Sequence, residues 1–218
     1  MPRETIRDWR RSGRSGRVLQ ARIDESCPIC GPAHLDEVEY TYLLGLYLGD
    51  GCLSEHRRGV FKLRISLDSR QSMIIEECAR SMAIVARGRR VGRQAGRGCT
   101  IVGAYWKHWP CVFPQHGRGP KHSRRIELAP WQRRLTSAHP DRLLRGLVHS
   151  DGCRVENRVA GKTYPRYLFS NRSGDIQRLF CAACADFGVS WTQPSFKEIS
   201  VAKARDVAML DVVIGPKR

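Results

Sequence analysis

The chain has 218 residues, which is enough to bury a sizeable core in one domain or in two small ones. Its 38 Lys and Arg residues against 21 Asp and Glu residues give a formal net charge of +17. This excess favours a nucleic acid as the partner, because cations that neutralise phosphates supply most non-specific affinity. No apolar segment approaches the roughly 20 residues that cross a bilayer, which excludes a membrane-spanning protein. Nine Cys residues, an odd number, suit free thiols in a reducing compartment. We therefore expect a cytoplasmic protein with no membrane partner, nucleoid-associated if its source is bacterial.

Residues 1–39 form a basic arm ahead of the first periodic segment. The arm contains a Cys-x-x-Cys turn, Cys27 and Cys30, which can point two thiolates at one zinc ion. Two ligands are only half of a zinc knuckle, and the missing ones would be His34, or Cys181 and Cys184. Structural Zn²⁺ is one interpretation. The other is ordinary thiols in a turn, with the second Cys pair packed in the core.

The first repeat is expected over residues 40–113. Residues 43–51, LLGLYLGDG, predict a buried helix that ends at Asp-Gly, with Gly51 able to close it in the left-handed conformation. Residues 52–58 and 60–67 predict two paired strands, and the second alternates between an apolar face and a face that carries Lys62 and Arg64. Residues 69–86 predict an amphipathic helix, and a hairpin of 89–94 with 99–106 completes the order helix, two strands, helix, two strands.

A basic linker is expected over residues 114–139. Residues 107–131 break the strand and helix periodicity, and their polar centre contains Lys121, Arg124 and Arg125. We expect these three side chains to contact DNA backbone. A plain connection between repeats is the alternative, and a third interpretation takes Lys121 or His122 to a scissile phosphate.

The second repeat, residues 140–214, follows the same order as the first. Residues 140–150 predict a helix, 166–173 a strand, 174–187 a helix, 189–195 and 198–202 two strands, and 203–213 a last helix. Arg166 and Lys197 are its candidate DNA contacts. This repetition rests on periodicity and is independent of any motif, so it supports a duplicated fold.

The two helices that open the repeats share a sequence pattern. The second one, residues 144–152, reads LRGLVHSDG, so both follow Leu-x-Gly-Leu-apolar-x-small-Asp-Gly. Small residues lie four apart in each, Gly45 with Gly49 and Gly146 with Ser150, and therefore share a face that allows close helix pairing. Paired in this way, the helices would present Asp50 and Asp151 together. Convergent carboxylates at helix C-termini are suited to Mg²⁺ or Mn²⁺.

This doubled motif resembles the LAGLIDADG homing endonuclease family in its two-motif monomeric form, over about residues 40–213. The resemblance implies an α+β fold of two αββαββα repeats, packed as pseudo-symmetric halves through the motif helices. It also implies that Asp50 and Asp151 bind the metal ions that assist DNA cleavage. The alternative to metal binding is a purely structural role, in which Asp50 and Asp151 only terminate buried helices.

Two functional hypotheses follow. The first is a site-specific endonuclease that cuts double-stranded DNA as a monomer, with Lys107 and Lys203 as further catalytic candidates because each follows the last strand of a repeat. The second is a non-cleaving DNA-binding transcriptional regulator on the same fold. An RNA-binding maturase is a third class, for which the sequence shows no specific sign.

Overall fold

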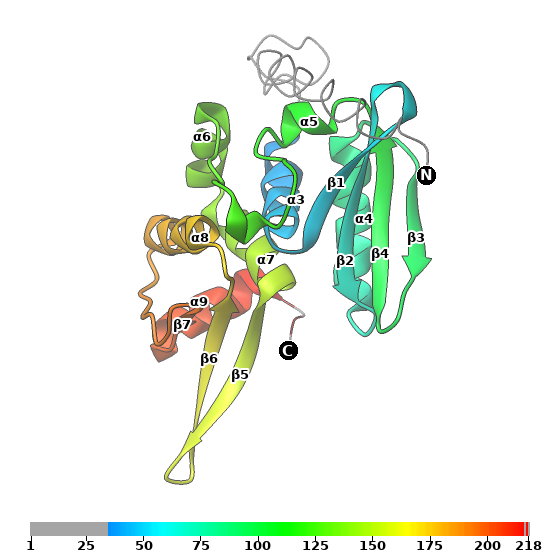
Figure 1. Cartoon of the computed structure of the whole chain (residues 1–218). Helices are drawn as coiled ribbons and strands as arrows, with labels where there is room; N and C mark the ends of the chain where they lie inside the picture. The colour runs from blue at the N-terminus through cyan, green and yellow to red at the C-terminus, as the bar shows by residue number, and fades with distance from the viewer. Residues whose placement is uncertain (1–34, 216, 218) are drawn as a thin grey trace, which may run out of the picture.

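The computed structural model describes residues 35–215 and residue 217 (Figure 1). The first repeat consists of α3 (Glu37–Asp50), β1 (Gly51–His56), β2 (Val60–Asp68), α4 (Ser72–Val85), β3 (Val91–Ala95) and β4 (Cys99–Trp106). The second consists of α7 (Pro140–Asp151), β5 (Gly152–Val159), β6 (Lys162–Ser170), α8 (Gly174–Phe187), β7 (Glu198–Val201) and α9 (Ala204–Ile214). The duplicated α+β architecture predicted from periodicity is therefore confirmed.

Helix α3 lies at the centre of the molecule. Asp36 caps its N-terminus, since its side chain accepts a hydrogen bond of 3.0 Å from the backbone N–H of Glu39. Every residue from Tyr40 to Leu48 is buried, which explains why this helix is apolar on all sides rather than amphipathic. Its neighbour is α7, and the two motif helices pack along each other between the two sheets (Figure 1).

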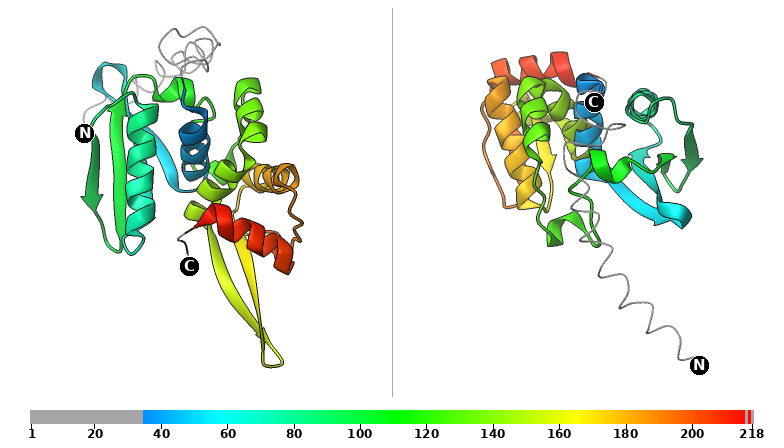
Figure 2. Two further views of the ribbon diagram at one scale, coloured as in Figure 1. Left: turned by 180° about the vertical axis from the view of Figure 1, so that it is seen from behind. Right: turned by 90° about the horizontal axis from the view of Figure 1, so that it is seen from above.

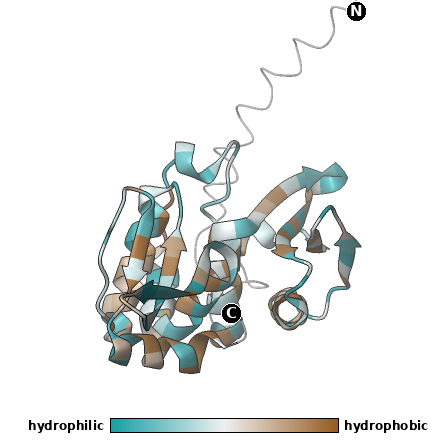
Figure 3. Ribbon diagram, turned by 90° about the horizontal axis from the view of Figure 1, so that it is seen from below, coloured by the Kyte–Doolittle hydropathy of each residue, from teal (hydrophilic) through white to brown (hydrophobic). Residues whose placement is uncertain are grey.

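The first sheet is antiparallel with the strand order β1-β2-β4-β3. Central strand β2 alternates as the sequence predicts, with Phe61, Leu63, Ile65 and Leu67 buried and the residues between them on the outer face. The same alternation appears as bands of contrasting hydropathy along strands in Figure 3. Helix α4 covers the apolar face of this sheet, as the rear view in Figure 2 shows.

The second sheet has three strands in the order β5-β6-β7, and its β5–β6 hairpin projects beyond the body of the repeat (Figure 1). The strand predicted at residues 189–195 does not form, and Thr192 makes only an isolated bridge to Ser200. Pro194 lacks the N–H that a ladder needs, and the N–H of Ser190 donates to the Asp206 carboxylate at 2.9 Å. This repeat is therefore one strand narrower than the first.

The basic linker expected over residues 114–139 carries structure of its own. It follows the short helix α5 (Trp109–Val112) and contains a 3₁₀ turn (Lys121–Ser123) and the helix α6 (Pro130–Ala138), which periodicity analysis missed. Trp131 and Leu135 of α6 are buried, and the Gln132 amide donates a 2.6 Å hydrogen bond to the Tyr40 hydroxyl of α3. The segment is thus anchored to the central helix.

Within the described residues, no helix is both long enough and apolar enough to cross a membrane.

Candidate active site between the motif helices

The motif helices approach each other through their small residues. A Cβ atom built on Gly45 would lie 2.8 Å from Gly146 Cα, and one built on Gly49 would lie 2.8 Å from the Asp151 carboxylate oxygen Oδ2. These separations are shorter than real Cβ atoms tolerate, so only residues without a side chain fit at these two positions. The predicted small-residue face is confirmed, and the close approach brings the C-terminal ends of α3 and α7 together.

The two glycines after the carboxylates act differently from our expectation. Gly51 (φ −87°) and Gly152 (φ −109°) are extended, not left-handed, because each helix passes directly into the first strand of its repeat. A Cβ on Gly152 would lie 2.8 Å from Val148 Cα, and one on Gly51 would collide with Tyr47. Glycine is therefore required here for space rather than for a positive φ.

Asp50 and Asp151 are the last residues of α3 and α7, and the pKa values of both carboxylates are raised. The Asp50 side chain is exposed at the end of α3, but the protein packed around its carboxylate partly desolvates it and, with a further contribution from the Asp151 charge, raises its pKa to about 6. Burial also raises the pKa of Asp151, although a 2.6 Å hydrogen bond from the Asn171 amide Nδ2 to Asp151 Oδ2 opposes the rise. A carboxylate at the negative, C-terminal end of a helix is electrostatically unfavourable, so two of them close together favour the binding of cations.

Two lysines, Lys121 and Lys217, place positive charge at these helix ends. Lys121 Nζ donates to the Gly49 carbonyl of α3 at 2.8 Å and lies 5.2 Å from the centre of the Tyr47 ring. Lys217 Nζ donates to the last carbonyls of α7, those of Val148 at 2.9 Å and His149 at 2.8 Å. Burial lowers the pKa of both ammonium groups, to about 8 for Lys121, while Asp50 and Asp151 oppose that fall. Each motif helix therefore has a lysine at its C-terminal end, beside its carboxylate.

The catalytic candidates chosen from strand order lie elsewhere. Lys107 follows β4 five residues after Val102, whose partner Ile65 pairs with Gly51, so it is about 17 Å along the strand from the carboxylate end. Lys203 precedes α9 and donates to Ser190 Oγ at 3.0 Å. The structure brings neither lysine to Asp50 and Asp151, and their catalytic role remains a sequence-based prediction without geometric support.

Of the seven predicted DNA contacts, Lys121 lies at the end of α3, as described above, and the other six divide into two groups. Lys62 and Arg64 lie on the outer face of the first sheet, where the Lys62 ammonium is 5.1 Å from the Tyr105 ring centre and Arg64 donates to Ser54 Oγ at 3.0 Å. Arg166 lies on the outer face of β6, and its Nε makes no hydrogen bond within the described part of the chain.

The other predicted contacts lie on connecting segments. Arg124 donates to the Gln115 carbonyl, Arg125 is paired with Glu127 on the surface, and the Lys197 ammonium lies 5.0 Å from the Phe196 ring centre. Their DNA-binding role stays a prediction. The guanidinium of Arg124 already donates a hydrogen bond within the chain.

The zinc prediction also stays untested. Cys27 and Cys30 lie outside the described residues. Cys184 is fully buried in the core with a raised pKa, and Cys181 packs against that core. This is the packing that the alternative interpretation expects.

The carboxylate pair offers the ligands that a hard divalent cation prefers. Mg²⁺ binds through one or two carboxylates and fills its remaining positions with water and substrate phosphate oxygens. Asp50 and Asp151 meet that requirement, and carbonyls at the helix ends add further oxygens nearby. Two carboxylates suit Mg²⁺ or Mn²⁺, whose other ligands would be water and phosphate oxygens. Among the described residues, no group of three or more His, Cys, Asp or Glu side chains is placed to hold a metal ion.

Lys217 and Asn171 were missed by sequence reasoning, although a signal for Lys217 exists. Lys121 stands 15 residues after Trp106, the end of β4 (121 minus 106), and Lys217 stands 16 residues after Val201, the end of β7 (217 minus 201). Because these two sequence separations are nearly equal, pseudo-symmetry would have predicted equivalent positions for Lys121 and Lys217. Nothing in the local sequence distinguishes Asn171.

Comparisons with known proteins agree with this architecture. No family model and no curated protein sequence matches the chain. Structures of the homing endonuclease I-DmoI align with it, one over 82% of this chain and 96% of its own at a TM-score of 0.56 and 16% identity, and a complex with DNA and Mn over 83% and 98% at 0.54 and 12%. The N-terminal LAGLIDADG domain of WhiA aligns over 93% of this chain and 91% of its own, at a TM-score of 0.52 and 14% identity.

These neighbours share the doubled repeat over most of the chain, at identities that establish a common fold and no more. The motif letters, the close glycine crossing and the paired carboxylates are what the family resemblance implies. The chain therefore has a LAGLIDADG-like fold with two repeats.

Proposed function

We propose that this chain is a monomeric, divalent-metal-dependent endonuclease that cuts both strands of a specific double-stranded DNA site. The observation that carries the proposal is the convergence of Asp50 and Asp151, each with a lysine at the same helix end. Like-charged carboxylates held together with raised pKa values cost folding stability, and such arrangements concentrate at functional sites. The I-DmoI structure with DNA and Mn supports the same use of this fold.

The DNA would lie along the outer faces of the two sheets, with its phosphates passing over the motif helix ends. Lys62, Arg64 and Arg166 point from those faces and would contact the duplex. Sequence would be read by side chains on the strands, because base edges in the major groove carry the code. The narrower second sheet and its projecting hairpin imply that the two half-sites are read differently.

Each strand would be cut near one carboxylate. Metal ions held by Asp50 and Asp151 would supply the positive charge that polarises a phosphate and activates water. Lys121 and Lys217 would offset the charge that develops in the transition state, and they are better placed for this than Lys107 or Lys203. Asn171 would hold the Asp151 carboxylate in one orientation.

A non-cleaving DNA-binding regulator on the same fold is the second candidate. The WhiA domain shows that the fold is not confined to proteins named as endonucleases. The basic outer faces serve this candidate equally well, so salt-dependent binding to DNA does not separate the two. Metal-dependent breakage does.

The test is a cleavage screen on a randomised duplex library with Mg²⁺ or Mn²⁺, beside the Asp50→Asn/Asp151→Asn double variant. Defined ends produced by the wild type alone would support the endonuclease and reveal its site. Enrichment of bound sequences without broken ends, under either metal, would refute it in favour of the regulator.

A further inference from the structure

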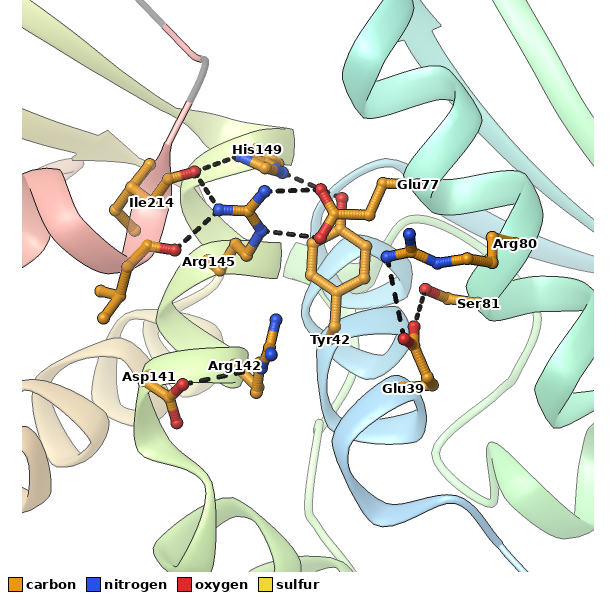
Figure 4. Close-up of polar contacts among 11 residues, drawn as sticks. Glu39, Tyr42, Glu77, Arg80, Ser81, Asp141, Arg142, Arg145, His149 and Ile214 are labelled. Atoms are coloured by element: carbon orange, nitrogen blue, oxygen red, sulfur yellow. Dashed lines mark hydrogen bonds and ion pairs between the residues drawn. The ribbon is translucent and has the colours of Figure 1, made fainter.

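Arg145 occupies the variable position of the second motif, just before Gly146, where it is partly buried and joins the two repeats. The first motif has the fully buried Leu44 at the corresponding place. Arg145 of α7 instead reaches Glu77 of α4 in a fork, with Nε 2.7 Å from Oε1 and Nη2 2.7 Å from Oε2 (Figure 4). The two side chains are only 15% and 12% exposed, so this bidentate pair is well shielded from water.

The third nitrogen of the Arg145 guanidinium makes hydrogen bonds outside the ion pair with Glu77. Arg145 Nη1 donates to the backbone carbonyls of Val213, at 2.7 Å, and Ile214, at 2.5 Å, at the C-terminal end of α9. Carbonyls at a helix end lack partners inside the helix. Arg145 therefore attaches the end of α9 to α7 while the same side chain is fixed by the first repeat.

His149 reinforces this attachment. Its Nε2 donates to the Ile214 carbonyl at 2.8 Å, and its Nδ1 accepts from the Tyr42 hydroxyl at 2.9 Å (Figure 4). Burial lowers the pKa of His149 to about 4, so the ring is neutral and one tautomer satisfies both bonds. The end of α9 is thus gripped by two side chains of α7 that lie one turn apart.

The chain then turns back at Gly215. This residue has φ +71°, and a Cβ there would lie 2.8 Å from Arg145 Nη1, so both the backbone and the neighbour demand glycine. Two residues later, Lys217 reaches the end of α7, where its third bond goes to the Ser150 carbonyl at 3.2 Å. Glu77 in the first repeat is therefore linked through Arg145 to the end of α9, and Lys217, two residues beyond Gly215, lies beside Asp151.

We propose that Glu77 and Arg145 are positioning residues, which fix the end of α9 so that Lys217 is held at the second carboxylate. The inference rests on the proposed function for its catalytic consequence, but not for its structural one. Lys121 has no such dependence, because it extends from the segment between the repeats and lies against Tyr47. Loss of Arg145 should therefore affect one strand cut and spare the other.

The structural consequence is tested by pulsed acetylation of lysine amines, followed by mass spectrometry of each lysine peptide. The variants are Arg145→Met, which approximately keeps side-chain length, Glu77→Gln and Gly215→Ala. The matched control is Arg142→Met on the same helix, because Arg142 is partly exposed and, within the described part of the chain, its only ion pair is with its neighbour Asp141, at 3.6 Å. We expect labelling of Lys217 to rise about tenfold in Arg145→Met, which corresponds to one lost charge-assisted hydrogen bond, with Lys121 unchanged. Unchanged labelling of Lys217 in Arg145→Met and Gly215→Ala, both folded, would overturn the proposal.

The catalytic consequence is tested on a cleavable duplex with each strand labelled separately. Arg145→Met and Lys217→Met should slow the same strand, and the double variant should be no slower than Lys217→Met alone, since the two act in series. Equal slowing of both strands, or additive losses, would show that Arg145 serves only folding. If the wild type cuts no DNA, the proposed function fails, and the labelling experiment still decides the positioning role.

Discussion

Replacing Gly146 with alanine puts a methyl group where the backbone of the other motif helix already lies. A Cβ on Gly146 would stand 2.9 Å from Gly45 Cα and 3.0 Å from the Leu46 nitrogen, and closer still to the Tyr42 carbonyl. These neighbours are backbone atoms that cannot rotate away, so the two helices must separate.

The size of the effect follows from two opposing terms. Overpacking of a tight contact costs about 1–3 kcal/mol, and this contact belongs at the upper end. Alanine returns up to about 1 kcal/mol through its higher helix propensity. The free energy of unfolding should therefore fall by about 2 kcal/mol, which lowers Tm by about 4–8 °C in a domain of this size.

Thermal unfolding by circular dichroism measures the change, with Gly174→Ala as the matched control. Gly174 is also helical, but a Cβ there would meet only the Arg178 side chain, at 3.5 Å. The control should keep or slightly raise Tm. If Gly146→Ala melts at the wild-type temperature, the motif helices do not cross as closely as described, and the convergence of Asp50 and Asp151 loses its basis.

Three further predictions concern the site. Asp50 has a raised pKa of about 6, so the folded state binds its proton more tightly than the unfolded chain, and its contribution to stability is lost as pH rises from about 4 through 6. Asp50→Asn should therefore raise Tm relative to wild type at pH 7.5 and not at pH 4, and an equal effect at both pH values would refute the electrostatic account. Lys121→Met should slow single-turnover cleavage by about 100-fold or more, and Lys107→Met should not; the reverse order would restore the strand-based assignment. Cys52 and Cys153 are exposed on the outer faces, in register with Arg64 and Leu168, so alkylation by a bulky maleimide should abolish DNA binding unless DNA is bound first. Unimpaired binding after complete labelling would place the DNA elsewhere.

Sequence periodicity was sufficient to predict most of the repeated architecture because elements such as β2 and α4 bury one well-defined face. The alternation in β2 and the spacing of Gly45 with Gly49 directly encode which atoms face the core and which face the other helix. Both signals are local in sequence, so they can be interpreted without knowing the tertiary partner.

The failures arise where long-range contacts decide the structure. Helix α6 is short and polar, and its position depends on Gln132 and Trp131 contacting the distant Tyr40. The strand expected at 189–195 has suitable apolar residues, but Pro194 and the bond from Ser190 to Asp206 remove it from the ladder. The contacts that place α6 and the bond from Ser190 to Asp206 lie outside any window of ten residues, whereas Pro194 is a local signal against a strand.

The site was predicted in part for the same reason. Asp50 and Asp151 belong to the repeated motif, so their convergence follows from the helix crossing. Lys121 and Lys217 reach the carboxylates from irregular segments, where side-chain direction depends on the whole fold. Pseudo-symmetry therefore identified the strand-end lysines Lys107 and Lys203, and Lys121 was only one of the interpretations of the linker, whereas the structure places Lys121 and Lys217 at the helix ends.

The central claim is that each motif carboxylate serves one strand of a bound duplex. The most direct measurement is cleavage of a selected site by Asp50→Asn and Asp151→Asn separately, with the two strands carrying different labels and with DNA affinity measured in parallel. We predict that both variants bind DNA as tightly as the wild type while neither makes the double-strand cut. A variant that still cuts both strands at the wild-type rate would contradict the account.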